Sequence, residues 1–526
     1  MSALAILLFG LALSVLLVVR CNSLLVYFQQ EEYDSKRFFT AWKDVRLYDV
    51  IASAVIFVFL ILIAVNGDRA IVVVVMSLLL LAIAYREHHY HYKKPLVNTS
   101  RVQRIRAVSL CMLVLLALVA TVFMPFAVVI LQVVPVVIVG ANLLLLPAQK
   151  RTNEGFINEA KLRLSENNAQ RIGVTGSFGK TTVKHMLAEM LEVGGPVFYS
   201  KGSVNTVLGL TRHIRQRLQP AHRYFVAEMG AYQRGSIQRL CEFVQPRFGI
   251  VTAVGEAHAE RFGGIETTAI AKAELAQWVC GQQGILVTSE DVMTHLPFSQ
   301  LQQQHKDCFV VVGHNTECDV QIVSSELKER KWHICLRFAA NETFDYTMPL
   351  LGNHNVMNSA LAVALLHAID ASLLSQLAPK MAELQQVKHR LELREVPGEA
   401  AILDDAYNAN EKGFGNAIEV LRQLADERGG RAVVVTPGIA ELGDEHNEVH
   451  TRLGAQCAAL CDVVVVVNPV RIKTFISALA DAQATIIEVP SLQEVREKLS
   501  GLGLTTSDIV LYANDLPDIL EEKRLL

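Results

Sequence analysis

The fold of most of this chain is decided by one stretch, Arg171-Ile172-Gly173-Val174-Thr175-Gly176-Ser177-Phe178-Gly179-Lys180-Thr181-Thr182. An apolar strand runs into a glycine loop, and residues 183–191 continue at the helical period. Glycines let backbone N–H groups turn toward phosphates, and the following helix adds positive potential at its amino terminus. Lys180 can reach the outer phosphates and Thr181 can hold magnesium. The stretch predicts a phosphate-binding loop of the short G-x-x-G-K-T form, the alternative being a purely structural turn.

Two later strands end in polar residues. The apolar strand from Tyr224 ends at Glu228, and the strand over 248–254 leads into Gly255-Glu256-Ala257-His258. Open α/β sheets bind ligands at the carboxyl ends of their strands. Taken alone, Glu228 is an ordinary acid at a strand end and His258 an ordinary loop histidine. Because both follow a phosphate-binding loop in order, we expect them to be metal ligands.

The apolar residues, 51% of the chain, are concentrated before residue 148. Residues 2–19 form an uninterrupted apolar run of spanning length, and shorter runs follow at 48–65 and 70–85. Residues 107–147 are apolar over about twice a spanning length, with Met124-Pro125 near the middle. We therefore expect an α-helical membrane region of about five spans, without an isolated charge in the middle of any span.

Basic residues gather after the first, third and fifth expected spans, at 36–46, 93–106 and 150–151. Lys and Arg accumulate on the cytoplasmic side of membrane proteins. This pattern predicts a multi-pass protein of the bacterial inner membrane, with everything after residue 150 in the cytoplasm. The helices can be a plain anchor, or they can form a groove for a lipid-linked substrate, and both alternatives stay open.

Overall charge and cysteine spacing exclude several classes of protein. The 49 basic and 52 acidic side chains nearly balance, so nucleic acid is not an expected partner. The nine cysteines form no C-x-x-C pair, which argues against a zinc knuckle. We expect all nine cysteines to be reduced and mostly buried, as in a reducing cytoplasm.

Seven stretches follow one another between about residues 170 and 445: Thr175–Lys184, Glu228–Ala231, Gly255–Gly263, Ala271–Glu274, Gly352–Asn358, His389–Leu391 and Asp404–Asn410. In their content and their order they resemble the Mur ligase family, most closely its members that add D-alanyl-D-alanine. The resemblance implies a P-loop central domain over 149–385 and a Rossmann-like carboxyl-terminal domain over 386–526. The expected fold is thus a membrane region over 1–148 followed by two α/β domains.

The resemblance also implies site residues. ATP would be bound by Gly176, Gly179, Lys180, Thr181, Thr182, Asn355, Arg390, Asp404 and Asp405. Mg²⁺, two ions in all, would be held by Thr181, Glu228, His258 and Lys272, the lysine being carried as a carbamate. Lys180, His258, Lys272 and Arg390 would be catalytic, and Asn205, Tyr407, Asn408 and Asn410 would lie near the incoming amino compound. From spacing alone, Lys272 is a solvated helix lysine, and 404–410 a polar turn after a strand.

The expected reaction is ATP-dependent amide-bond formation, in which a carboxylate is phosphorylated and then attacked by an amine. Because no UDP-sugar domain precedes the loop strand, the resemblance favours a lipid-linked or polymeric cell-envelope carboxylate in place of a soluble acceptor. Pro437-Gly438 and Tyr512-Ala513-Asn514-Asp515 depart from the family's pattern, so the amino compound can be an amino acid or a dipeptide. The alternatives are a polymerase of the poly-γ-glutamate kind and a nucleotide-gated transporter or scaffold without ligase activity.

Overall fold

The structure is a computed structural model. It describes residues 3–44, 49–65, 69–90, 92, 94–231, 233–255, 264–339, 341–407, 410–440, 442–480 and 482–514. The chain divides after Thr152 into two compact units, one helical and one α/β. Each unit is described by itself.

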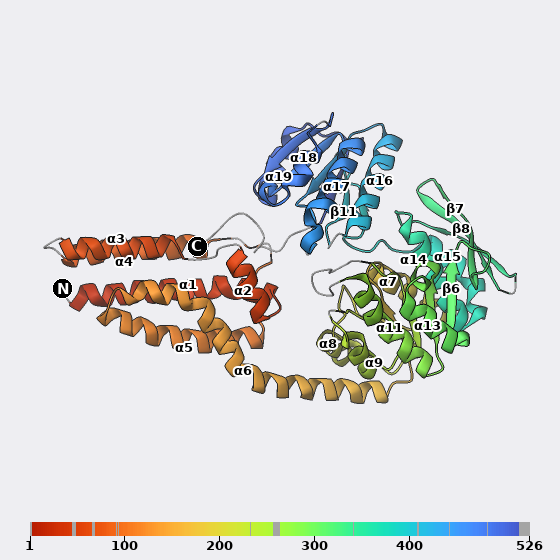
Figure 1. Cartoon of the computed structure of the whole chain (residues 1–526), viewed down its shortest axis with the longest axis horizontal. Coiled ribbons are helices and arrows are strands. Elements are labelled where there is room, and N and C mark those ends of the chain that lie inside the picture. Colours follow the sequence, from red (N-terminus) through yellow and green to blue (C-terminus); the bar gives the residue numbers. More distant parts are fainter. Residues whose placement is uncertain are drawn as a thin grey trace. The chain divides into compact units, whose positions relative to one another are not determined.

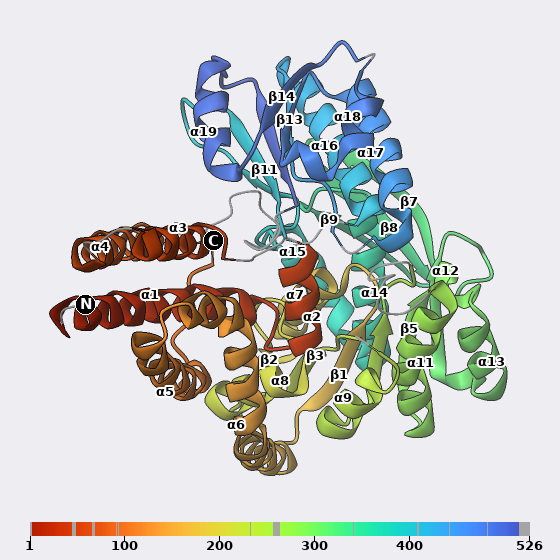
Figure 2. The ribbon, with the colours of Figure 1, turned by 60° about the vertical axis from the view of Figure 1, so that its left-hand side comes forward.

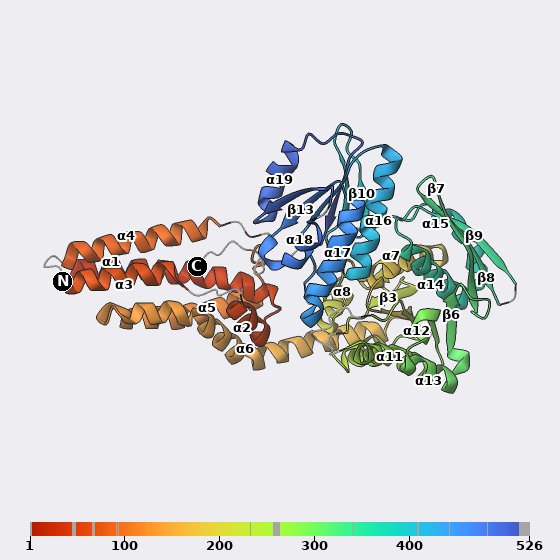
Figure 3. The same ribbon diagram turned by 45° about the horizontal axis from the view of Figure 1, so that its top comes forward.

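The first unit consists of helices. They are α1 (Ala3–Gln30), α2 (Ser35–Asp44), α3 (Ile51–Val65), α4 (Arg69–His88), α5 (Ser100–Val122) and the beginning of α6 (Phe126–Ser165). α1 lies alongside α4 and α5, and α3 lies alongside α4 (Figures 1 and 3). The break predicted at Met124-Pro125 is confirmed, because α5 ends at Val122 and α6 begins at Phe126.

The expectation of five spans is met only in part. Four helices of the described chain are long and apolar enough to cross a membrane: α1, α4, α5 and α6. α3 has 15 residues and falls short of the length that a bilayer requires. The last two of the five expected spans correspond to α5 and α6, and 70–85 lies within the longer α4.

α1 continues eleven residues beyond the predicted end of the first apolar run. Arg20 lies within this helix and is only 2% exposed. Its guanidinium forms one ion pair with Asp49 and another with Glu87 of α4, the second at 3.0 Å. Asp49 also caps α3, because its carboxylate accepts from the N–H groups of Ala52 and Ser53 at 3.1 and 3.2 Å. The helix can bury this cation because two carboxylates and their hydrogen bonds compensate its charge.

The second unit opens with a nine-stranded sheet in the order β2-β3-β1-β4-β5-β6-β7-β8-β9. The strands are β1 (Gln170–Thr175), β2 (Val197–Tyr199), β3 (Tyr224–Glu228), β4 (Phe248–Val251), β5 (Ile285–Ser289), β6 (Phe309–Gly313), β7 (Val320–Lys328), β8 (Lys331–Phe338) and β9 (Thr343–Met348). The pairs from β2 to β7 are parallel, and β7, β8 and β9 pair antiparallel.

Helices cover both faces of this sheet (Figure 1). One apolar core lies under α7 (Lys180–Leu191), α14 (His354–Ile369) and α15 (Leu374–Ala382). The other lies under α8 (Val207–Arg217), α9 (Ser236–Val244), α11 (Ile265–Gly281), α13 (Leu296–Gln304) and the end of α6. The short elements α12 (Glu290–Met293), η1 (Glu192–Gly194), η2 (Lys306–Cys308) and η3 (Ala371–Leu373) connect them.

A six-stranded sheet follows, in the order β10-β11-β15-β12-β13-β14. It comprises β10 (Glu392–Arg394), which is antiparallel, and the parallel strands β11 (Ala401–Asp405), β12 (Ala432–Thr436), β13 (Val463–Val467), β14 (Thr485–Val489) and β15 (Ile509–Ala513). Its helices are α16 (Glu411–Arg428), α17 (His446–Leu460), α18 (Lys473–Ala478) and α19 (Leu492–Gly501), with η4 (Gly443–Glu445) and η5 (Pro469–Arg471).

Neighbouring valines of these strands face opposite cores. α16, α17 and α18 cover one face of the sheet and α19 covers the other (Figure 2). Val434 belongs to the core on the first face and Val433 to the core on the second. A parallel strand buried on both faces needs such continuous apolar runs. These strands build the carboxyl-terminal sheet, so the two α/β sheets that the family resemblance implies are both present.

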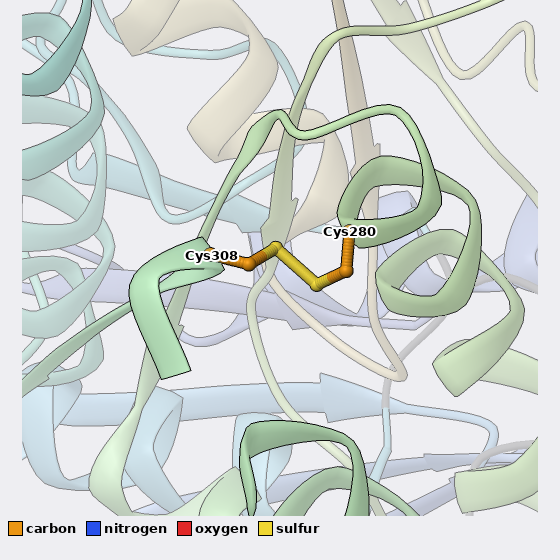
Figure 4. The surroundings of a disulfide bond; sticks show 2 residues. All are labelled: Cys280 and Cys308. Carbon is orange, nitrogen blue, oxygen red and sulfur yellow. A yellow bond between two sulfur atoms is a disulfide. The ribbon is translucent and has the colours of Figure 1, made fainter. Parts of the chain in front are cut away.

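The prediction that all cysteines are reduced is wrong for one pair. Cys280, near the end of α11, and Cys308, in η2, are joined by a disulfide (Figure 4). The two residues are 28 positions apart, and only the packing of α11 beside β5 and η2 brings their Cα atoms to 5.5 Å. The remaining cysteines are free, and those that are buried are Cys21, Cys241, Cys457 and Cys461.

Candidate nucleotide and metal site

The predicted phosphate-binding loop joins β1, in the middle of the parallel strands, to α7. Gly176 and Gly179 adopt φ angles of 152° and 76°, which side chains other than hydrogen rarely tolerate. A Cβ atom at Gly179 would also lie 2.6 Å from Oδ1 of Asn358, on α14. Both glycines are thus required by the path of the backbone and by its close contacts.

The segment after β4 lies directly against this loop. The Ser177 hydroxyl donates to the Gly255 carbonyl at 2.8 Å and accepts from the Gly255 N–H at 2.9 Å. The Ser177 N–H donates to the Ala253 carbonyl at 2.8 Å. The phosphate-binding loop after β1 and the segment after β4 therefore meet at the same edge of the sheet. His258, which follows this segment, lies outside the described residues.

Lys180 folds over the loop. Its ammonium donates to the carbonyls of Gly176 and Ser177 at 2.6 and 3.0 Å. Burial lowers the pKa of Lys180 to about 8, an effect that Glu228 opposes and the Arg390 cation reinforces. A half-buried ammonium bonded to neutral carbonyls, beside a left-handed glycine turn and a helix amino terminus, has the chemistry of a phosphate-binding group.

The Glu228 carboxylate, 1% exposed at the end of β3, connects three segments. Its Oε2 atom accepts from the Thr181 hydroxyl and from the Lys184 ammonium, each at 3.0 Å. Its Oε1 atom accepts from the Asn205 amide at 3.2 Å. The structure thus brings Thr181 and Glu228, the two expected metal ligands, together, and it places Asn205, which we expected near the amino compound, against the same carboxylate. It adds Lys184, which the sequence does not distinguish from an ordinary helix lysine.

Lys272 lies on α11 and is only 4% exposed, so the alternative of a solvated helix lysine is wrong. Burial, together with the Lys180 cation, lowers the pKa of Lys272 well below its usual range. Among the described residues, none forms a hydrogen bond or ion pair with its amine. Burial therefore favours the neutral amine, which is the nucleophilic form of the side chain, over the ammonium.

Three of the residues expected to bind ATP line one cavity. Thr182 from α7, Asn355 from α14 and Arg390 from the segment before β10 face it, together with Leu350, Leu351, Gln386, Val387 and Leu391. The Asn355 amide donates to the Leu351 carbonyl at 2.6 Å and accepts from Asn358 at 3.0 Å. The Arg390 guanidinium lies 4.6 Å from the ring centre of Tyr407, which is 45% exposed.

Asp404 and Asp405 end β11 with different partners. Asp404 accepts from Arg394 at 2.6 Å and from His389 at 2.9 Å, so its charge is compensated within its own domain. Asp405 accepts from the Leu391 N–H at 3.2 Å, and burial raises its pKa to about 7. The oxygens of Asp404 and Glu392 and a nitrogen of His389 are close enough for a metal, but Arg394 already bridges both carboxylates.

Asn410 is the N-cap of α16, because its side-chain oxygen accepts from the Gly413 N–H at 2.9 Å. Because the cap uses the side-chain oxygen, the amide nitrogen is the atom of Asn410 that would contact the amino compound. Asn408 lies outside the described residues.

These features define a class of protein: a P-loop sheet with a buried carboxylate beside the loop, followed by a Rossmann-like domain. Residues 174–366 match the Mur ligase middle domain, and residues 389–513 match the Mur ligase, glutamate ligase domain. The chain therefore belongs to the Mur ligase family.

Its curated relatives include the UDP-N-acetylmuramoyl-tripeptide–D-alanyl-D-alanine ligases of Escherichia coli (strain K12) and Bacillus subtilis (strain 168). The first is 28% identical over 291 residues, covering 55% of this chain and 62% of the relative; the second is 30% identical over 302 residues, covering 56% and 62%. The chain thus spans about three-fifths of their length.

Among solved structures, the UDP-N-acetylmuramoylalanyl-D-glutamyl-2,6-diaminopimelate–D-alanyl-D-alanyl ligase from Acinetobacter baumannii is 26% identical to this chain, with a TM-score of 0.58. The alignment covers 69% of this chain and 76% of that one. The two family domains lie within the α/β unit, and the first, helical unit lies outside both of them.

Proposed function

We propose that this chain is an ATP-dependent ligase that joins a carboxylate to an amino compound through an acyl phosphate. The observation that carries the proposal is the Glu228 carboxylate, held at 3.0 Å from the hydroxyl of Thr181 in the phosphate-binding loop. We assign a role to each of three parts of the chain. Residues 1–148 lie in the membrane, residues 149–385 bind ATP, and residues 386–526 close over the nucleotide. We assign catalytic roles to Lys180, His258, Lys272 and Arg390.

The residues present fit ATP and Mg²⁺. Thr181 and Glu228 offer a hydroxyl and a carboxylate oxygen, which are the ligands that Mg²⁺ prefers. Lys180 offers a cation beside the loop amides, and Arg390 stands at a cavity with Thr182 and Asn355. Bound Mg²⁺ would offset the negative charge that gathers as a carboxylate approaches the γ-phosphate.

The chemistry requires water to be excluded. The acceptor carboxylate attacks the γ-phosphorus and releases ADP, and the amine then displaces phosphate to form the amide. Lys180 and Arg390 bind the phosphates and so lower the barrier to the first step. Because the proposed ATP ligands come from both α/β domains, closure of these domains is a condition of reaction, and it protects the acyl phosphate from hydrolysis.

We assign a carbamate to Lys272. The neutral amine attacks carbon dioxide, an N–C bond forms, and one proton leaves to solvent. The product is an anion, which suits a position near a second Mg²⁺ better than an ammonium does. The depressed pKa and the burial of Lys272 support this assignment.

We propose that the first unit holds the protein in the bacterial inner membrane and that the acceptor is a lipid-linked or polymeric carboxylate of the cell envelope. Two observations support the proposal. Four helices have the length and composition of membrane spans, and the two family domains match this chain only from residue 174 onward. The amino compound is an amino acid or a dipeptide, D-alanyl-D-alanine included, approaching Asn205, Tyr407, Asn408 and Asn410.

Phosphate release by the purified full chain tests the proposal. We expect release only when Mg²⁺-ATP, an amino compound and a carboxylate acceptor are all present, and we expect envelope lipids to serve better than UDP-muramoyl tripeptide. Lys180→Met should abolish release, whereas Lys161→Met, an exposed lysine of α6, should leave it unchanged. Steady release without the amine would instead favour a transporter, and products of growing length would favour a polymerase.

The carbamate has its own test. Lys272→Ala should lose phosphate release and regain part of it when acetate or another short carboxylate is added, because the added anion can occupy the place of the carbamate. Glu274→Ala, on the same helix, should not respond to acetate. Absence of rescue at every carboxylate concentration, in a folded Lys272→Ala protein, would contradict the assignment.

A further inference from the structure

A second buried lysine of α7 has no part in the reaction proposed above. The Lys184 side chain is 0% exposed, and its ammonium donates to the Glu228 Oε2 atom at 3.0 Å. It donates also to the carbonyl of Gly202, in the loop that carries Asn205. Lys184 therefore places its amino group against the carboxylate that we expect to bind Mg²⁺, and that carboxylate in turn favours the charged ammonium form.

The same carboxylate oxygen is shared with a second proposed ligand. Glu228 Oε2 accepts from the Thr181 hydroxyl at 3.0 Å as well as from Lys184. The other oxygen accepts from the neutral Asn205 amide at 3.2 Å. A divalent cation that takes both Thr181 and Glu228 must enter beside the Lys184 ammonium, in a region with little water. The metal cation and the Lys184 ammonium would then be neighbours, and two positive charges side by side repel strongly where solvent screening is weak.

We propose that Lys184 makes metal binding at Glu228 conditional on nucleotide. The inference rests on the proposed nucleotide and metal site and names its regulation. Without nucleotide, Lys184 neutralises Glu228, so the loop attracts Mg²⁺ only weakly. The phosphates of ATP add negative charge at the loop and reverse this balance. Metal and nucleotide then enter together, and the loop does not hold a metal ion before the nucleotide arrives.

A merely structural role for Lys184 makes a different prediction. If the lysine only ties α7 to the loop at Gly202, any variant that weakens this tie loosens the site and weakens metal binding. If its charge is what matters, a neutral side chain that still donates a hydrogen bond strengthens metal binding without nucleotide. Lys184→Gln and Lys184→Arg separate these two roles, because the first removes the charge and the second keeps it.

The experiment is a titration of the full chain in detergent with Mn²⁺, followed by electron paramagnetic resonance, with and without the non-hydrolysable analogue AMPPNP. We expect the wild-type protein to bind Mn²⁺ tightly only with the analogue. Lys184→Gln should bind Mn²⁺ without it, at least about tenfold more tightly than the wild type does. Lys184→Arg should behave as the wild type. Asn205→Ala, which removes a neutral donor from the same carboxylate, should not tighten nucleotide-free binding.

Three outcomes decide the matter, in proteins whose circular dichroism matches the wild type. Nucleotide-free binding by Lys184→Gln that is no tighter than that of the wild type overturns the inference. Equal tightening by Lys184→Arg also overturns it. If the wild type binds no Mn²⁺ even with the analogue, the proposed site itself fails, which is distinguishable from failure of the role of Lys184. If Lys184→Gln does not fold, Lys184→Met, which also removes the charge, takes its place in the comparison.

Discussion

Asp405 at the end of β11 should make the carboxyl-terminal domain less stable as the pH rises. Burial raises its pKa from 3.8 to about 7, despite the opposing Arg390 cation and the hydrogen bond from the Leu391 N–H. The folded state therefore holds a proton on Asp405 between about pH 4 and 7 that the unfolded state has released. Stability from this proton is present below pH 4 and is lost as the pH rises toward 7.

The size of this loss in stability follows from the pKa shift of Asp405. Each pKa unit corresponds to about 1.4 kcal/mol, so the full shift corresponds to about 4 kcal/mol. The Asp405 side chain keeps partial contact with solvent, which screens the effect, and we expect about 2 kcal/mol. Asp405→Asn keeps the acceptor for Leu391 and removes the charge. It should therefore gain about 2 kcal/mol relative to the wild type between pH 4.5 and pH 8.

Hydrogen exchange with mass spectrometry measures this stability difference locally, in the sheet that contains β11. Peptides that cover β11 and β15 report the opening of this sheet in the full chain, and comparison of the two proteins at the same pH cancels the intrinsic exchange rate. Asp426→Asn, an exposed acid of α16 that pairs with Arg422 at 2.7 Å, is the matched control and should show no such trend. A stability difference between wild type and Asp405→Asn that stays constant from pH 4.5 to 8 would refute the reasoning.

Three further variants probe other parts of the molecule. Glu228→Ala should weaken Mg²⁺ binding in the presence of ATP about 10- to 100-fold, measured by calorimetry, and unchanged affinity would exclude Glu228 as a ligand. Arg20→Met leaves two buried carboxylates unpaired and should destabilise the helical unit by about 3–5 kcal/mol in detergent unfolding, whereas adding Asp49→Asn and Glu87→Gln should restore most of it. Asn410→Ala removes the N-cap of α16 and should lower the free energy of opening of that helix, measured by hydrogen exchange, by about 1 kcal/mol, a smaller effect than that of Arg20→Met.

The sequence predicts those parts of the fold that local pattern determines. The glycines at 176 and 179 are needed for positive φ, and the valine runs of β12 and β13 can only be strands buried on both faces. The order of strand, loop and helix places Glu228 at the same sheet edge as the loop, because parallel strands point the same way.

What the sequence does not show depends on contacts between distant segments. The Cys280–Cys308 disulfide needs the crossover between β5 and β6, and no spacing rule reveals it. Lys184 looks like any helix lysine until Gly202 and Glu228 are brought against it. Asn410 belongs to a stretch that the family resemblance assigns to the amino compound, yet it caps a helix, a role that depends on where α16 begins.

The central claim is that a carboxylate is phosphorylated by ATP at this site, and transfer of oxygen tests it most directly. The acceptor that supports phosphate release is labelled with ¹⁸O in its carboxylate, and the phosphate released by the full chain is analysed by mass spectrometry. An acyl phosphate leaves one carboxylate oxygen on the phosphate, so we predict one ¹⁸O atom in each phosphate formed with the amine present. Phosphate without ¹⁸O, released at the same rate, would show that water attacks ATP and that the chain is not a ligase of this kind.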